Sequence, residues 1–190
     1  MKRITWRSLP SLLLLAAAAC SGEGTPGSDG KAATKAAPVA FGVGAPAPAY
    51  SATLLDGDSV SLAGLRDQVV LLNVWATWCH PCRTEIPELQ ALHTKYADRG
   101  FRVVGVSVDG DGDEAGIRDF VKEFSMTYPI WRDPDERVSA LFSVVGVPAT
   151  YLIDRQGIMR WRTVGPVRPG DTTLVRAIES ALAPAPAPAP

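Results

Sequence analysis

Three stretches of this chain are apolar almost without interruption, and each is rich in β-branched residues. They occupy residues 69–74, 102–108 and 147–153. A strand with one face in water alternates polar and apolar residues, whereas a continuous apolar run is typical of a strand covered on both faces. The pattern therefore predicts three buried strands of a central sheet.

Segments with the spacing of an amphipathic helix lie between these runs and after the last of them. At residues 83–92, 115–124 and 171–182 apolar side chains recur every three or four positions, as in an amphipathic helix. The helix at 83–92 joins the first two buried strands, which makes a parallel βαβ unit and an α/β fold. Shorter elements are expected at residues 129–131 (strand), 135–142 (helix) and 158–162 (strand).

Two short strand candidates precede the core, at residues 50–55 and 59–62. The dipeptide Asp56-Gly57 between them is typical of a tight hairpin turn. An N-terminal β-hairpin is therefore expected ahead of the first buried strand.

Composition divides the chain into four parts. Residues 21–42 are rich in Gly, Ser, Ala, Pro and Lys, so they are expected to form a flexible tether. Residues 43–182 carry the periodic patterns and suffice for one domain. Residues 183–190 alternate Ala and Pro, which is typical of an extended tail.

Residues 1–20 have the composition of an export signal. Three basic residues precede an apolar run at 12–19, which is shorter than the roughly 20 residues that a membrane span needs. Cys20 follows, as in a bacterial lipoprotein signal, although Ala17 stands where leucine is usual. We expect lipidation of Cys20, since a free thiol at the start of an exported chain has no other use. Cleavage of an ordinary Ala-x-Ala site at 17–19 is the alternative.

The charge balance argues against a polyanionic partner. The chain has 19 basic and 20 acidic residues, and without the three basic residues of the export segment 16 remain, a net charge of about −4. Neither nucleic acid nor a polybasic contact with a membrane surface is expected.

Cys79 and Cys82 lie where the buried strand at 69–74 passes into the helix at 83–92. The first backbone N–H groups of a helix lack internal partners, and the helix dipole places partial positive charge there. A thiolate at that end is stabilised, so the pKa of the thiol falls. One thiol then attacks the disulfide of a partner, and the second resolves the mixed disulfide.

Metal sites are poor alternatives. Zinc needs two ligands besides Cys79 and Cys82, and the remaining candidates are scattered. The acidic stretch at 109–113 superficially resembles a calcium loop, but Glu114 replaces the glycine that such a loop needs. Asp113 is instead expected to cap the following helix.

The string Trp75-Ala76-Thr77-Trp78-Cys79-His80-Pro81-Cys82 resembles the thioredoxin superfamily, whose signature is Trp-Cys-x-x-Cys at a strand–helix junction. From Asn73 to Leu89 the chain is similar to the extracytoplasmic TlpA/ResA type, which is related to the AhpC/TSA and Redoxin families. The resemblance covers roughly residues 43–182. It implies a thioredoxin fold, in which helices flank a mixed sheet that carries an N-terminal hairpin and a helix–strand insert.

The resemblance also implies roles for particular residues. Cys79 would attack and Cys82 would resolve. Pro148 would follow a cis peptide bond beside the cysteines, and the backbone of Val147 would pair with a bound substrate chain.

The other residues of the motif are expected to tune the site. His80 occupies the position that adjusts redox potential in the superfamily, and Trp78 would form a flat apolar wall. Pro81 suits a first helical turn. Asn73 stands where thioredoxins have a buried aspartate, so it is expected to be a structural amide bonded to neighbouring backbone. His93 is expected to be a surface or partly buried structural residue.

The implied activity is thiol–disulfide exchange with protein substrates outside the cytoplasm, with no metal or cofactor besides the redox-active Cys79–Cys82 disulfide. Reduction is the favoured direction, for example in cytochrome c maturation, with electrons from a membrane thiol carrier of the DsbD/CcdA type. The expected location is the periplasmic side of a bacterial membrane, anchored at Cys20 or soluble.

Two alternatives stay open. The N-terminal hairpin is shared with peroxiredoxins, but their peroxide site has threonine three residues before the cysteine, and Thr77 is two before Cys79. A binding module that uses the thioredoxin groove without catalysis is the other.

Overall fold

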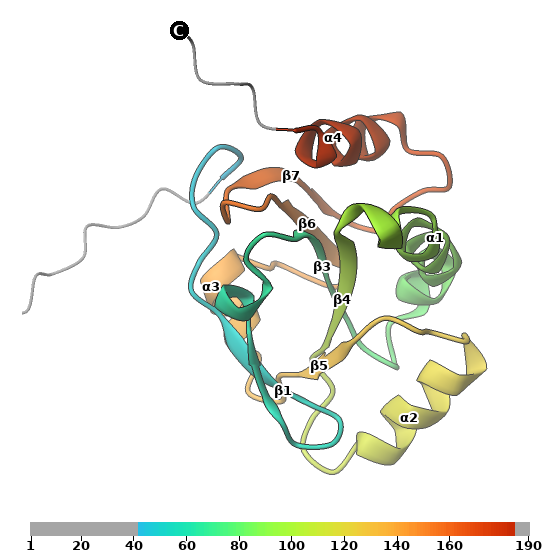
Figure 1. The fold of residues 1–190 in the computed structure, drawn as a ribbon. Helices are drawn as coiled ribbons and strands as arrows, with labels where there is room; N and C mark the ends of the chain where they lie inside the picture. The colour runs from blue at the N-terminus through green and yellow to red at the C-terminus, as the bar shows by residue number, and fades with distance from the viewer. Residues whose placement is uncertain (1–41, 185–190) are drawn as a thin grey trace, which may run out of the picture. The chain divides into compact units, whose positions relative to one another are not determined.

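The computed structural model describes residues 42–184 of the protein. Cys20, the export segment, nearly all of the tether and residues 185–190 lie outside this range, so the expectations for them remain predictions. Within it, seven strands form one mixed sheet in the order β2-β1-β5-β4-β3-β6-β7 (Figure 1). This confirms the predicted α/β class.

The elements follow the predicted order. The strands are β1 (Ser51–Leu54), β2 (Ser59–Ser61), β3 (Val69–Trp75), β4 (Phe101–Ser107), β5 (Ile130–Arg132), β6 (Ala149–Ile153) and β7 (Met159–Val164). The helices are α1 (His80–Tyr96), α2 (Glu114–Glu123), α3 (Arg137–Phe142) and α4 (Thr172–Leu182), with short 3-10 turns at Leu62–Leu65 and Ala97–Arg99.

Strand β3 is the centre of the core. All seven of its residues are buried, and it pairs in parallel with β4 and antiparallel with β6. Helix α2 packs on one face of the sheet, where Phe120 stacks on Trp75. Helix α3 lies on the opposite face, where Tyr151 donates a hydrogen bond to the carbonyl of Phe142 (Figure 1). The predicted buried strand and its parallel βαβ unit are confirmed.

The predicted hairpin is also present. Strands β1 and β2 are antiparallel, and Gly57 in the connecting turn has a φ of 97°, which favours glycine. Strand β1 in turn pairs with β5, so the hairpin extends the central sheet.

Gly105 of β4 is required by a close approach of side chains. A Cβ atom at this position would lie 2.9 Å from Nε1 of Trp75 and 3.2 Å from the ring of Tyr128. Both aromatic rings therefore lie against the bare backbone of Gly105.

Two details of helix capping differ from the predictions. Asp113 stands at the start of α2, but its side chain makes no capping hydrogen bond. Helix α3 starts at Arg137, two residues later than expected, because Glu136 has a left-handed backbone with a φ of 51°. The carboxylate of the buried Asp133 accepts a hydrogen bond from the N–H of Val138 and so holds this helix start.

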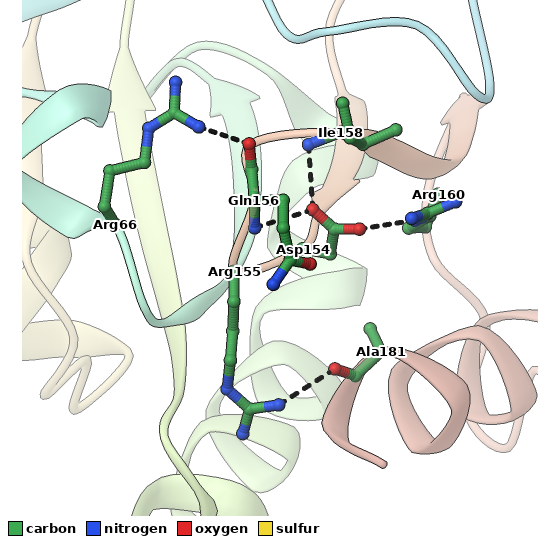
Figure 2. Close-up of polar contacts among 7 residues, drawn as sticks. All are labelled: Arg66, Asp154, Arg155, Gln156, Ile158, Arg160 and Ala181. Atoms are coloured by element: carbon green, nitrogen blue, oxygen red, sulfur yellow. Dashed lines mark hydrogen bonds and ion pairs between the residues drawn. The ribbon is translucent and has the colours of Figure 1, made fainter. Parts of the chain in front are cut away.

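The end of β6 farthest from Pro148 is a turn built on a buried carboxylate. One oxygen of Asp154 accepts hydrogen bonds from the N–H groups of Gln156 and Ile158, and the other lies 2.5 Å from Nε of Arg160 (Figure 2). Arg155 bonds to the carbonyl of Ala181, which ties α4 to this turn. Both oxygens of the Asp154 carboxylate thus make contacts that stabilise this turn.

Within residues 42–184, no helix combines the length and the apolar character that crossing a bilayer would demand.

Candidate active site

Cys79 and Cys82 lie at the junction of β3 and α1 and form a disulfide with their Cα atoms 5.3 Å apart. Cys79 is the N-cap of α1, and its Sγ accepts a hydrogen bond of 3.2 Å from the N–H of Cys82. Pro81 lies in the first turn of α1, where a backbone N–H would have no partner within the helix, so the missing N–H of proline costs no hydrogen bond. The first turn of α1 thus directs backbone dipoles at the Cys79 sulfur.

The two sulfurs differ in access to solvent. Cys79 is 3% exposed and Cys82 is fully buried, whereas the neighbouring Trp78 is 68% exposed. His80 and Pro81 are exposed as well. The surface at the motif is therefore formed by Trp78, His80 and Pro81, and both cysteines lie beneath it.

The Val147–Pro148 peptide bond is cis, as expected. Strand β6 begins directly after it, and Ala149 pairs with Val74 at the end of β3. This register places Pro148 beside the segment that leads to Cys79. The carbonyl of Pro148 accepts a hydrogen bond from Gly165, which connects the proline to the loop before α4.

Asp109 holds the loop that carries the motif. Its buried carboxylate accepts hydrogen bonds from the backbone N–H of Thr77 at 3.1 Å and from the Thr77 hydroxyl at 2.6 Å. The hydroxyl of Ser107 donates a third at 2.7 Å. Sequence inspection treated Asp109 only as part of an acidic loop, because its partner lies on another element.

Asn73 bonds to side chains, and the expectation of backbone partners was wrong. Its Nδ2 donates to Oε1 of Glu85 at 2.7 Å and to the hydroxyl of Thr150 at 3.0 Å. The N–H of Val167 donates to Oε2 of Glu85 at 2.7 Å. The side chain of Asn73 points from β3 toward α1, so it bonds to the side chain of Glu85 and not to neighbouring backbone.

Glu85 was missed by sequence analysis, although a signal was present. It is fully buried three residues after Cys82, on the face of α1 that also carries Ile86 and Leu89. A carboxylate within an apolar helical face calls for an explanation. Burial raises the pKa of Glu85 to about 7, although the hydrogen bonds from Val167 and Asn73 act in the opposite direction.

The two histidines lie in different surroundings. His80 occupies the first position of α1 on the surface. His93 is half-buried, and its Nδ1 accepts a hydrogen bond from the N–H of Val103. Burial lowers the pKa of His93. In the part of the chain that the structure describes, no group of three or more potential metal ligands occurs.

Comparison with known proteins agrees with this geometry. Residues 43–162 match the AhpC/TSA family. The chain belongs to that family. The thiol-disulfide oxidoreductase ResA of Bacillus cereus is 32% identical over 123 residues, which cover 65% of this chain and 70% of ResA. The thioredoxin-like protein YneN of Bacillus subtilis is 37% identical over 123 residues, covering 64% and 71%.

Solved structures give the same relationship. A protein from Chlorobium tepidum, assigned as the thiol:disulfide interchange protein DsbE, superimposes with a TM-score of 0.68 at 32% identity, covering 75% of this chain and 99% of its own. A DsbF homologue from Corynebacterium diphtheriae gives 0.63 at 35% identity, covering 72% and 86%. The expected relationship of this AhpC/TSA-family chain to TlpA/ResA-type members of the thioredoxin superfamily is confirmed.

Glu85 gives this family member a testable pH dependence of stability. Since its pKa in the folded chain is about 7 against an ordinary 4.5, the folded state binds the proton more tightly. The resulting stabilisation is complete below pH 4.5 and is lost as the pH rises through 7, an effect on the order of 3 kcal/mol.

Urea unfolding of wild type and Glu85→Gln in the disulfide form, in which the cysteines do not titrate, measures this effect. The difference between their unfolding free energies is expected to change between pH 4.5 and 7. Parallel curves across this interval would contradict the assignment.

Proposed function

We propose that this chain is an extracytoplasmic thiol–disulfide oxidoreductase that reduces disulfides in protein substrates. The observation that carries the proposal is the Cys79–Cys82 disulfide at the start of α1, together with the cis-proline that opens β6, the strand paired with β3. The names of the relatives, thiol-disulfide oxidoreductase and thiol:disulfide interchange protein, support the same chemistry.

In the first step the thiolate of Cys79 attacks one sulfur of the substrate disulfide. A bond forms between Cys79 and that sulfur, and the substrate S–S bond breaks. The second substrate sulfur leaves as a thiolate and takes a proton from water. The helix dipole and the N–H of Cys82 stabilise the attacking thiolate.

In the second step Cys82 attacks the sulfur of Cys79 and expels the remaining substrate thiolate, which is protonated by water. The thiol proton of Cys82 passes to Glu85, one helical turn away, whose pKa of about 7 suits a proton acceptor at neutral pH. The protein is left as the disulfide, and two electrons have moved to the substrate. Glu85 thereby acts as the proton acceptor, a role that the amide of Asn73 cannot take because it does not titrate in this range.

The surrounding residues receive the remaining roles. The backbone of Val147 pairs with the substrate chain, Pro148 shields the disulfide, and Trp78 forms an apolar wall for the residues that flank the substrate cysteine. His80 adjusts the redox potential through its position beside Cys79.

Reduction in an oxidising compartment needs imported electrons. We assign their delivery to a membrane thiol carrier of the DsbD/CcdA type, and the substrate to an apocytochrome c before haem attachment. Lipid attachment at Cys20 would hold the domain on the periplasmic side of the membrane, with residues 21–42 as the tether.

Substitution of the two cysteines separates their roles. Cys79→Ser is expected to lower the reduction of insulin disulfides by roughly 100-fold or more, because the nucleophile is lost. Cys82→Ser keeps the attack but not the resolution, so mixed disulfides with the substrate should accumulate and be visible by mass spectrometry. Rapid consumption of hydrogen peroxide without insulin reduction would favour a peroxidase, and an unchanged cellular phenotype of Cys79→Ser would favour a binding module.

The direction of electron flow is measurable inside cells. Because its electron donor keeps a reductase in the reduced state, alkylation of thiols in acid-quenched cells should find Cys79 and Cys82 mostly as free thiols. Deletion of the membrane thiol carrier should convert the pair to the disulfide. A pair that is mostly oxidised in wild-type cells argues for an oxidase instead.

Cell fractionation tests the anchor. The wild-type protein is expected in the membrane fraction and labelled by a radioactive fatty acid, because two or more acyl chains give stable attachment. Cys20→Ser should lose the label. Wild-type protein recovered unlabelled in the soluble periplasmic fraction would contradict lipidation and favour cleavage at the Ala-x-Ala site.

A further inference from the structure

Among the buried side-chain atoms that have no hydrogen-bond partner in the described residues, three belong to residues on β3 and just before β5. They are Oδ1 of Asn73, Nε1 of Trp75 and Oη of Tyr128. Asn73 and Trp75 are 0% exposed and Tyr128 is 3% exposed. Buried polar atoms of this kind are as a rule satisfied by an internal water.

The register of the sheet brings these atoms together. Asn73 and Trp75 lie two residues apart on β3 and so point to the same face. Gly105 pairs with Asn73, and the rings of Trp75 and Tyr128 both lie against its bare backbone. Asn73 is bonded to Glu85, so the group extends to the carboxylate behind Cys82.

The donors and acceptors in this group match a single water molecule. Trp75 Nε1 is only a donor, and Asn73 Oδ1 is only an acceptor. Burial and the negative charge of Glu85 both raise the pKa of Tyr128, so its hydroxyl keeps the proton and donates. A water accepts two hydrogen bonds and donates two, which leaves its second donation for the Glu85 carboxylate.

We propose that Asn73, Trp75, Tyr128 and Glu85 form an internal water site, and that Tyr128 acts through this water as a positioning residue for Glu85. The proposal rests on the proposed function, in which Glu85 receives the proton of Cys82. By donating toward the carboxylate through the water, Tyr128 favours its ionised form and keeps it ready to accept a proton.

Few other groups bear on the charge of Glu85. Tyr128 faces it from the segment before β5, and Cys82 lies one turn back on the same face of α1. Strands β3 and β6 contribute the neutral side chains of Asn73 and Thr150, and the loop before α4 contributes the N–H of Val167.

The test removes only the hydroxyl. In Tyr128→Phe the ring still covers Gly105 and still contacts His93, so the fold should be kept, as circular dichroism will verify. The matched control is Tyr96→Phe, a tyrosine that is 1% exposed at the far end of α1. The pKa of Glu85 is followed by carbon-13 NMR of its carboxyl group, assigned with Glu85→Gln.

Loss of the donated hydrogen bond should raise the pKa of Glu85 by about half a unit or more in Tyr128→Phe and leave it unchanged in Tyr96→Phe. The pH dependence of the second step, measured as resolution of a preformed mixed disulfide, should move upward by the same amount. An unchanged Glu85 titration in a folded Tyr128→Phe protein overturns the proposal.

A high-resolution crystal structure provides a second test that needs no variant. A water within hydrogen-bond distance of Tyr128 Oη and Trp75 Nε1 is expected, and a dry, well-ordered cavity there overturns the proposal. The NMR titration needs no turnover, so it distinguishes failure of this proposal from failure of the proposed function, which would appear as a wild-type protein without exchange activity.

Discussion

The carboxylate of Glu85 connects parts of the chain that lie far apart in sequence. It belongs to α1, accepts one hydrogen bond from Asn73 of β3 and a second from Val167 before α4. Asn73 extends the connection to Thr150 of β6. Removing a carboxylate from water is costly, and neutral donors offset this cost only in part, which is why the pKa of Glu85 rises to about 7.

A second buried carboxylate shows what a purely structural arrangement looks like. Asp154, at the other end of β6, has a guanidinium from Arg160 beside it and N–H donors from its own turn. Glu85 has hydrogen bonds from neutral groups, and it lies three residues after Cys82 on α1 instead of in a turn at the end of a strand. The difference in partners leaves Glu85 free to change its protonation near neutral pH, which a structural ion pair resists.

The reactive end of the molecule is assembled from loops that the sheet holds in place. Asp109 fixes Thr77 before the motif, and Gly165 binds the carbonyl of Pro148. These contacts join the ends of β3, β4 and β6, so the disulfide and the cis-proline keep their relative positions. A rigid frame around the disulfide favours exchange with a correctly oriented protein partner.

The order of helices and strands and the chemistry of the Cys79–Cys82 motif follow from local patterns in the chain. Periodicity, the Asp56-Gly57 turn and the position of Cys79 before a helix act over a few residues, so they can be recognised without coordinates. The environment behind the disulfide depends instead on how distant segments pack together. Asn73 reaches partners 12 and 77 residues away because strand register and the packing of α1 bring them to one face, and the rings of Trp75 and Tyr128 both lie against Gly105. No local pattern contains that register, and the sequence therefore predicted the two cysteines of the motif but not the buried polar groups behind them.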